Sequence, residues 1–279
     1  MWKLWLKDGV EISEISDTFR ELRKRSEGAL IAFVIGGDPE PKFTSKILEA
    51  LTEGGADILE IGVPFSDPIA DGPTIQAADH RALMAGTTPE TIFDLVREAK
   101  TRSKVPIALL TYYNILYKMG VKKFAKKVSE HGVDGLIIPD LPIEEAEKYV
   151  QISRKEGVDT IFLATPLTSE PRLQAILSCT SGFLYLVSAF GVTGTREHVT
   201  KLTIDTIKRI HSCTIGRIPL AVGFGISKPN HVRTVLSHGV EGAIVGSAFV
   251  KIVEDNLNRP DRMVRDISEL TKQLKATTL

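Results

Sequence analysis

The sequence has few cysteines, no excess of either charge and no long apolar run, and each absence excludes a class of protein. Cys179 and Cys213 are the only cysteines among 279 residues, too few for a disulfide framework and typical of a reducing cytoplasm. Lys+Arg and Asp+Glu number 35 each, so no overall field favours nucleic acid or an anionic membrane. No apolar run approaches the roughly 20 residues that span a bilayer. We therefore expect a cytoplasmic protein without a nucleic-acid or membrane partner.

Eight apolar runs rich in β-branched residues alternate with segments of helical periodicity. The runs are 29–37, 57–64, 106–114, 135–140, 159–166, 182–189, 218–226 and 242–249. The helical segments are 42–53, 89–101, 121–131, 143–155, 170–178, 196–211, 229–238 and 262–275. Near-continuous apolar strands, each followed by a helix, predict a parallel sheet covered on its outer face. Eight such units, with no linker between them, predict an α/β protein that is a single (β/α)8 TIM barrel.

The same pattern sets the expected domain organisation. Residues 1–279 are predicted to form one barrel domain, in which a helix over 13–26 closes the barrel floor. Residues 1–12 would then be an N-terminal extension, and the Lys residues within their apolar stretch argue against a secretory signal. An open dinucleotide-binding sheet would require Gly-x-Gly-x-x-Gly after the first strand, and the turn at 36–39 does not match that motif.

Residues 59–73 read Leu-Glu-Ile-Gly-Val-Pro-Phe-Ser-Asp-Pro-Ile-Ala-Asp-Gly-Pro and place several polar groups at one strand end. Glu60 lies within the apolar strand, and the following loop supplies Ser66, Asp67 and Asp71. An interior-facing carboxylate loses hydration, which raises its pKa toward the range useful for proton transfer. Glu60 is therefore predicted to be a general acid/base, with Asp71 as a second carboxylate. The residues alone also allow a structural ion pair for Glu60 and turn roles for the two aspartates.

Glycine-rich junctions at 222–227 and 245–247 follow the last two predicted strands. In barrels these positions commonly bind phosphate through backbone N–H groups, helped by the positive end of a helix dipole. Neither junction contains Lys or Arg, so a backbone cradle is the expected form, although glycine at strand ends also serves packing. A third glycine pair at 191–194 is typical of a mobile lid.

The string at 59–73, together with the three glycine-rich segments, resembles the tryptophan synthase alpha chain family. The resemblance extends from about Ile15 to the C-terminal region and implies a role for ten residues. Glu60 and Asp71 would be the catalytic carboxylates. The implied substrate contacts are Gly194, Gly225, Gly246 and Ser247 for phosphate, Phe33, Tyr185 and Leu110 for the indole ring, and Thr193, which would meet Asp71 when the lid closes. A core role for Tyr185 stays open, and Ala189 stands where the family often has Arg.

The resemblance also implies the reaction and the partner. The reaction would be the reverse aldol cleavage of indole-3-glycerol phosphate to indole and glyceraldehyde 3-phosphate. It would need no cofactor in this chain, and indole would pass to a pyridoxal-phosphate-dependent beta subunit in an alpha2beta2 heterotetramer. The loop 64–72, Asn114 and Pro142 would form part of that interface. Within the residues themselves, no predicted strand carries a lysine for Schiff-base chemistry. The six histidines form no His-x-His or His-x-x-x-His pair for a metal.

Three alternatives remain at this stage. The chain could be another phosphate-binding barrel, although such enzymes lack the 59–73 string. It could be a non-catalytic subunit that only activates its partner, which the presence of Glu60, Asp71 and Tyr185 argues against. It could also be a free-standing lyase that releases indole without a partner.

Overall fold

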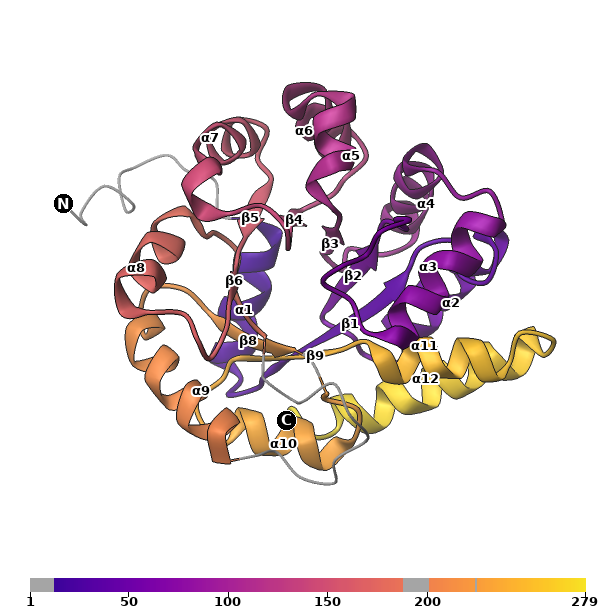
Figure 1. Ribbon diagram of the computed structural model, residues 1–279. Helices are drawn as coiled ribbons and strands as arrows, with labels where there is room; N and C mark the ends of the chain where they lie inside the picture. The colour runs from indigo at the N-terminus through magenta and orange to yellow at the C-terminus, as the bar shows by residue number, and fades with distance from the viewer. Residues whose placement is uncertain (1–12, 188–200, 224) are drawn as a thin grey trace.

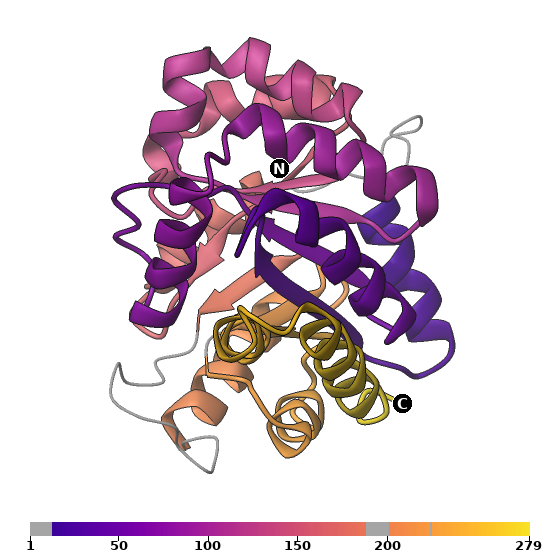
Figure 2. The same cartoon turned by 90° about the vertical axis from the view of Figure 1, so that its right-hand side faces the viewer.

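Parallel strands form a barrel that helices surround in a computed structural model, which describes residues 13–187, 201–223 and 225–279 (Figure 1, Figure 2). The strands are β1 (Ala29–Ile35), β2 (Ile58–Gly62), β3 (Ile107–Leu110), β4 (Gly135–Ile137), β5 (Asp159–Ile161), β6 (Leu163–Ala164), β7 (Leu184–Val187), β8 (Leu220–Gly223) and β9 (Gly242–Val245). Their order is β5-β4-β3-β2-β1-β9-β8-β7-β6. The predicted TIM barrel is therefore confirmed.

The fifth predicted run forms two short strands instead of one. β5 pairs with β4, and β6 pairs with β7. Only Phe162 separates β5 from β6, so the covalent chain itself joins the two ends of the sheet. Each half of the run makes its hydrogen bonds to a different neighbour, which explains why eight predicted strands become nine.

Helices cover the outside of the barrel and close one of its ends. They are α1 (Glu14–Lys24), α2 (Pro41–Glu53), α3 (Pro73–Met84), α4 (Pro89–Arg102), α5 (Tyr113–Met119), α6 (Val121–Glu130), α7 (Glu147–Lys155), α8 (Glu170–Cys179), α9 (Lys201–Thr214), α10 (Pro229–Leu236), α11 (Ser247–Asp255) and α12 (Pro260–Lys275), with a 3-10 turn at Ile143–Glu145. Several begin with proline, whose fixed φ suits the first helical turn. The sequence did not predict α3, α5 and α11.

Helix α1 closes the barrel floor, as the sequence predicts. Ser13 caps it by accepting a hydrogen bond from the Ser16 N–H at 3.2 Å. The apolar face of α1, which includes Ile15 and Phe19, is buried in one cluster with inward-facing strand residues, and the Phe19 ring lies 5.8 Å from that of Phe183. Chemistry is therefore left to the opposite end of the barrel, where the strands have their carboxyl ends.

Carboxylates at the start of three strands tie neighbouring strands together at the floor. Each accepts the N–H of a residue in the adjacent strand and pairs with a cation. The hydrogen bonds run from Leu30 to Asp57 (2.7 Å), from Ile107 to Asp134 (2.7 Å) and from Leu220 to Glu241 (3.0 Å). The cations are Lys275, Lys100 and Arg23 respectively.

No helix among the residues described is long and apolar enough to cross a membrane.

Candidate active site

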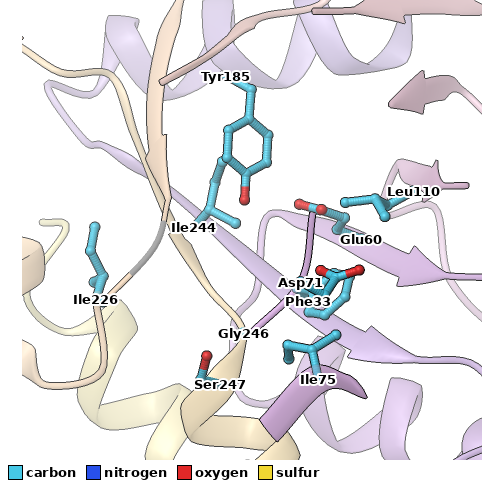
Figure 3. Close-up of a pocket in the computed structure, with 11 residues that line it drawn as sticks. Phe33, Glu60, Asp71, Ile75, Leu110, Tyr185, Ile226, Ile244, Gly246 and Ser247 are labelled. Carbon is cyan, nitrogen blue, oxygen red and sulfur yellow. The ribbon is translucent and has the colours of Figure 1, made fainter. Parts of the chain in front are cut away.

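A cavity lies at the carboxyl ends of the strands and holds most of the residues that the sequence analysis selected (Figure 3). It spans about 470 Å³ when the space open to solvent is counted. Its lining is Phe33, Glu60, Asp71, Ile75, Leu110, Tyr185, Gly225, Ile226, Ile244, Gly246 and Ser247. Eight of the ten predicted site residues are therefore together in one cavity. The other two, Thr193 and Gly194, lie outside the described residues, as does Ala189.

Glu60 projects from β2 into this cavity and has an unusual environment for a carboxyl group. Its side chain is 0% exposed, and neither carboxyl oxygen has a hydrogen-bond partner among the described residues. Burial raises its pKa to about 8, and the charge of Asp71 adds to the shift. The described part of the chain offers Glu60 no ion pair, so its burial is not explained by the structural alternative. A carboxyl with this pKa is mostly protonated at pH 7.

Asp71 is brought to the cavity by the loop 64–72, and Tyr112 holds it there. The Tyr112 hydroxyl donates a hydrogen bond to Asp71 Oδ2 at 2.6 Å and accepts one from the Ala70 N–H at 3.0 Å. The Phe65 ring stacks on the Tyr112 ring, with centroids 5.0 Å apart. Burial raises the pKa of Asp71, whereas the hydrogen bond from Tyr112 lowers it. The sequence analysis missed Tyr112, although its place just after β3 is where a barrel gathers site residues.

Tyr185 projects from β7 into the cavity near Glu60 (Figure 3). It also belongs to the interior cluster of the barrel, so it has both a core role and a place in the cavity wall. Burial, together with the charges of Glu60 and Asp71, raises the pKa of Tyr185, which keeps the phenol neutral. A Cβ at Gly223 would lie 2.4 Å from the Tyr185 hydroxyl and 2.7 Å from its ring. Glycine at 223 is therefore what gives the Tyr185 side chain its space.

The cavity also receives the N-terminus of α11, on the side where Gly246 and Ser247 lie (Figure 3). A Cβ at Gly246 would lie 2.8 Å from the Phe33 ring, so a side chain there would displace the cavity wall. Gly225 has φ +76°, a left-handed conformation that favours glycine. Backbone N–H groups at a helix N-terminus attract anions. This side of the cavity is therefore suited to a phosphate, and no basic side chain is among the lining residues that the structure describes.

Three further apolar residues line the cavity without having been predicted: Ile75, Ile226 and Ile244. With Phe33 and Leu110 they make part of the wall apolar. Figure 3 shows Leu110 next to Glu60 and Phe33 next to Asp71, whereas Ile226 lies apart from both carboxyl groups. In the sequence such residues cannot be told from ordinary core residues. The cavity thus combines an apolar wall, a neutral buried acid, a second carboxylate and an anion-binding helix end.

Comparison with known proteins agrees with this arrangement. The model of the family described as "Tryptophan synthase alpha chain" matches residues 19–279. The tryptophan synthase alpha chain of Methanoregula boonei is 48% identical over 252 residues, which is 90% of this chain and 94% of the relative. That of Arabidopsis thaliana is 42% identical over 262 residues, 94% of each chain.

A solved structure gives the same result for the fold. A chain from the Pyrococcus furiosus tryptophan synthase a2b2 complex superposes with a TM-score of 0.83 at 41% identity, covering 89% of this chain and 98% of the other. The sequence match, residues 19–279, thus includes every strand of the barrel, and the fold match covers 89% of the chain. The chain therefore belongs to the tryptophan synthase alpha chain family and is an enzyme subunit.

Proposed function

We propose that this chain, as one barrel domain, cleaves indole-3-glycerol phosphate to indole and glyceraldehyde 3-phosphate, which makes it a carbon–carbon lyase that needs no cofactor of its own. The observation that supports this most directly is Glu60, a fully buried carboxyl without a partner among the described residues, in a cavity with an apolar wall and a helix N-terminus. The apolar wall suits an indole ring, and the helix end suits a phosphate.

Glu60 would carry out both proton transfers of this reaction. Breaking the carbon–carbon bond leaves an electron pair on indole C3, so C3 must first gain a proton. Because its pKa is about 8, Glu60 holds a proton at pH 7 and donates it to C3. The resulting carboxylate then takes the proton of the side-chain hydroxyl, whose oxygen becomes the aldehyde oxygen as the bond breaks. The bond electrons return to the indole ring, and Glu60 ends protonated, ready for another cycle.

Asp71 would stabilise the indole ring while it is cationic. Protonation at C3 places positive charge on the ring nitrogen, and a carboxylate that accepts the ring N–H stabilises that charge. The hydrogen bond from Tyr112 lowers the pKa of Asp71 against the effect of burial, which favours the ionised form that this role requires. In this scheme Glu60 acts as a neutral acid and Asp71 as a carboxylate, so the two carboxyl groups have different protonation states, each suited to its task.

The remaining cavity residues would bind and orient the substrate. Phe33, Leu110 and Tyr185 would contact the indole ring together with the three isoleucines of the wall. Gly225, Gly246 and Ser247 would bind the phosphate through backbone N–H groups and the dipole of α11. Thr193 and Gly194 would contribute from the segment beyond the described residues.

We also propose that the chain works with a beta subunit. The related Pyrococcus furiosus protein is described as an a2b2 complex with mutual activation. The corresponding surface here would include the loop 64–72 with Asn114 and Pro142, all near the mouth of the barrel. Ile69 in this loop is 83% exposed, and Asn114 and Pro142 are also exposed. Indole would pass from the cavity to the partner, which would hold pyridoxal phosphate.

The test is indole release from indole-3-glycerol phosphate by the purified chain, with and without a tryptophan synthase beta subunit. We expect weak release by the chain alone and a large increase when the partner is added. Strong release that the partner does not change would indicate a free-standing lyase. Binding of the partner with no release under either condition would indicate a non-catalytic subunit, and no release without partner binding would favour a different phosphate-binding barrel.

Gly223→Ala should reduce this activity through Tyr185. The new methyl group would lie within 2.4–2.7 Å of the Tyr185 hydroxyl and ring, so the ring must move, and the cavity changes shape. A misplacement of about 1 Å costs up to about 100-fold in rate, and we expect kcat/KM to fall by roughly tenfold or more. Steady-state kinetics measure the fall, and thermal unfolding checks that the variant is folded. A folded variant with unchanged kcat/KM would show that the position of Tyr185 does not matter.

A further inference from the structure

Asp79 is a buried carboxyl group of α3 that the proposed reaction does not use. Its side chain is 3% exposed. Oδ1 accepts a hydrogen bond from the Phe65 N–H at 3.4 Å, and Oδ2 has no partner among the described residues. Arg81 of the same helix pairs instead with Asp38, through bonds of 2.7 and 2.8 Å, and lies 3.8 Å from Glu254. A buried carboxylate without a counter-ion is unfavourable, so a proton is the means of neutralising Asp79.

Two acidic groups that face Asp79 strengthen its preference for a proton: Asp71 of the loop and Asp38 after β1. The Tyr112 phenol at the start of α5 faces it as well, and Asp79 raises the pKa of that phenol. Burial raises the pKa of Asp79 to about 8, the charges of Asp71 and Asp38 add to the shift, and the hydrogen bond from Phe65 opposes it. At pH 7 Asp79 is therefore mostly a neutral acid.

The loop 64–72 is held at two places, one near each end. Near its beginning, the Phe65 N–H is bound by Asp79. At its end, Ala70 and Asp71 are bound by Tyr112. Ser66 and Asp67, between these anchors, are exposed. Because Asp71 lies on the loop, its position depends on both anchors.

We propose that Asp79 is a positioning residue for Asp71, holding the start of the loop 64–72 as a neutral acid. This rests on the proposed role of Asp71. The neutral acid accepts the Phe65 N–H without placing a second negative charge beside Asp71. Ionisation of Asp79 would repel Asp71 and loosen the loop, so the loop would be in its working position only while Asp79 keeps its proton.

Asp79→Asn and Asp79→Ala separate this role from simple packing. Asparagine is neutral and keeps an acceptor for the Phe65 N–H, so kcat at pH 7 should stay within about threefold of wild type. Alanine removes the acceptor, and kcat should fall by roughly ten- to a hundredfold with a smaller change in KM. Amide hydrogen exchange at Phe65, followed by NMR, should speed up in Asp79→Ala and stay slow in Asp79→Asn.

The pH profile is the second readout. In wild type, kcat should fall as pH rises through about 8, where Glu60 and Asp79 both ionise. The fall should be shallower in Asp79→Asn, because only Glu60 then titrates in this range. Asp159→Asn is the matched control: Asp159 is also buried with a raised pKa, but it lies at the barrel floor, bonded to Ser13. This variant should keep the wild-type pH profile and the wild-type exchange at Phe65.

Two results would overturn the proposal. One is an Asp79→Ala protein with unchanged kcat and slow exchange at Phe65. The other is an Asp79→Asn protein that loses as much activity as Asp79→Ala, since the ionised carboxylate would then be the required form. If no protein, wild type included, releases indole, the proposed reaction fails, while exchange at Phe65 still decides whether Asp79 holds the loop.

Discussion

Glu60→Gln should abolish indole release while leaving the barrel folded and able to bind the substrate phosphate. Glutamine has nearly the same shape, but its amide neither donates a proton to indole C3 nor accepts one from the hydroxyl. A single positioned acid/base step contributes about 10²–10⁴-fold. Because Glu60 would serve two such steps, we expect kcat to fall by at least about 10³-fold. A sensitive indole assay measures the residual rate, and calorimetric titration measures substrate binding to the inactive protein.

The same variant should be more stable than wild type at neutral pH. The folded pKa of Glu60 is about 8 against an ordinary value of 4.5, so folding retains a proton that the unfolded chain releases. The contribution of Glu60 to the free energy of unfolding is therefore present at low pH and is lost as pH rises from about 4.5 to about 8. Glutamine does not titrate, so urea unfolding should show a gain of roughly 1–3 kcal/mol at pH 7.

This stability measurement also serves as a control on the activity result. An inactive Glu60→Gln protein that is less stable at every pH would point to a structural role instead of proton transfer. Near-wild-type activity would remove Glu60 from the acid/base role altogether. An inactive protein that gains stability above pH 4.5 is the combination expected of a buried catalytic acid, whose environment is tuned for function at the expense of stability.

Much of the fold and the site could be predicted because the relevant signals are local. Glu60 is the one carboxylate within an apolar run, and side chains alternate between the two faces of a strand. The sequence therefore predicts that Glu60 lies on a buried strand, on the face opposite to Leu59 and Ile61. Glycines such as Gly246 follow a strand directly, so their place at the barrel mouth follows from the strand alone. Predicting these residues required no knowledge of contacts between distant segments.

The features that were not predicted from the sequence depend on tertiary contacts. Tyr112 acts through its hydrogen bonds to Ala70 and Asp71, about 40 residues earlier in the chain, and nothing local marks it. Helix α3 buries one large apolar residue, Ile75, together with two alanines and Asp79, so its apolar periodicity is too weak to predict a helix. The division of the fifth strand at Phe162 follows from pairing with two different neighbours.

Asp71→Asn should cause the second-largest loss of activity. An amide oxygen can still accept the ring N–H, but it brings no negative charge to stabilise the cationic ring. Removing one group that stabilises transition-state charge costs about 10²–10³-fold in kcat, and we expect a loss in this range, measured by steady-state indole release. Asp140→Asn is the matched control. Asp140 Oδ1 accepts the Tyr113 N–H at 2.8 Å, and Asp140 is not among the cavity residues that the structure describes.

Tyr112→Phe tests whether the charge or merely the presence of Asp71 matters. The lost hydrogen bond is one that lowers the pKa of Asp71, so in the variant this pKa rises. Activity that requires ionised Asp71 is lost as pH falls through that pKa, and the acid limb of the kcat profile should therefore move to higher pH. Wild-type activity in the Asp71→Asn protein would show that Asp71 is a loop or interface residue and not a catalytic one. An impaired Asp71→Asn protein, together with an unmoved acid limb in Tyr112→Phe, would mean that Tyr112 holds the loop without setting the charge of Asp71.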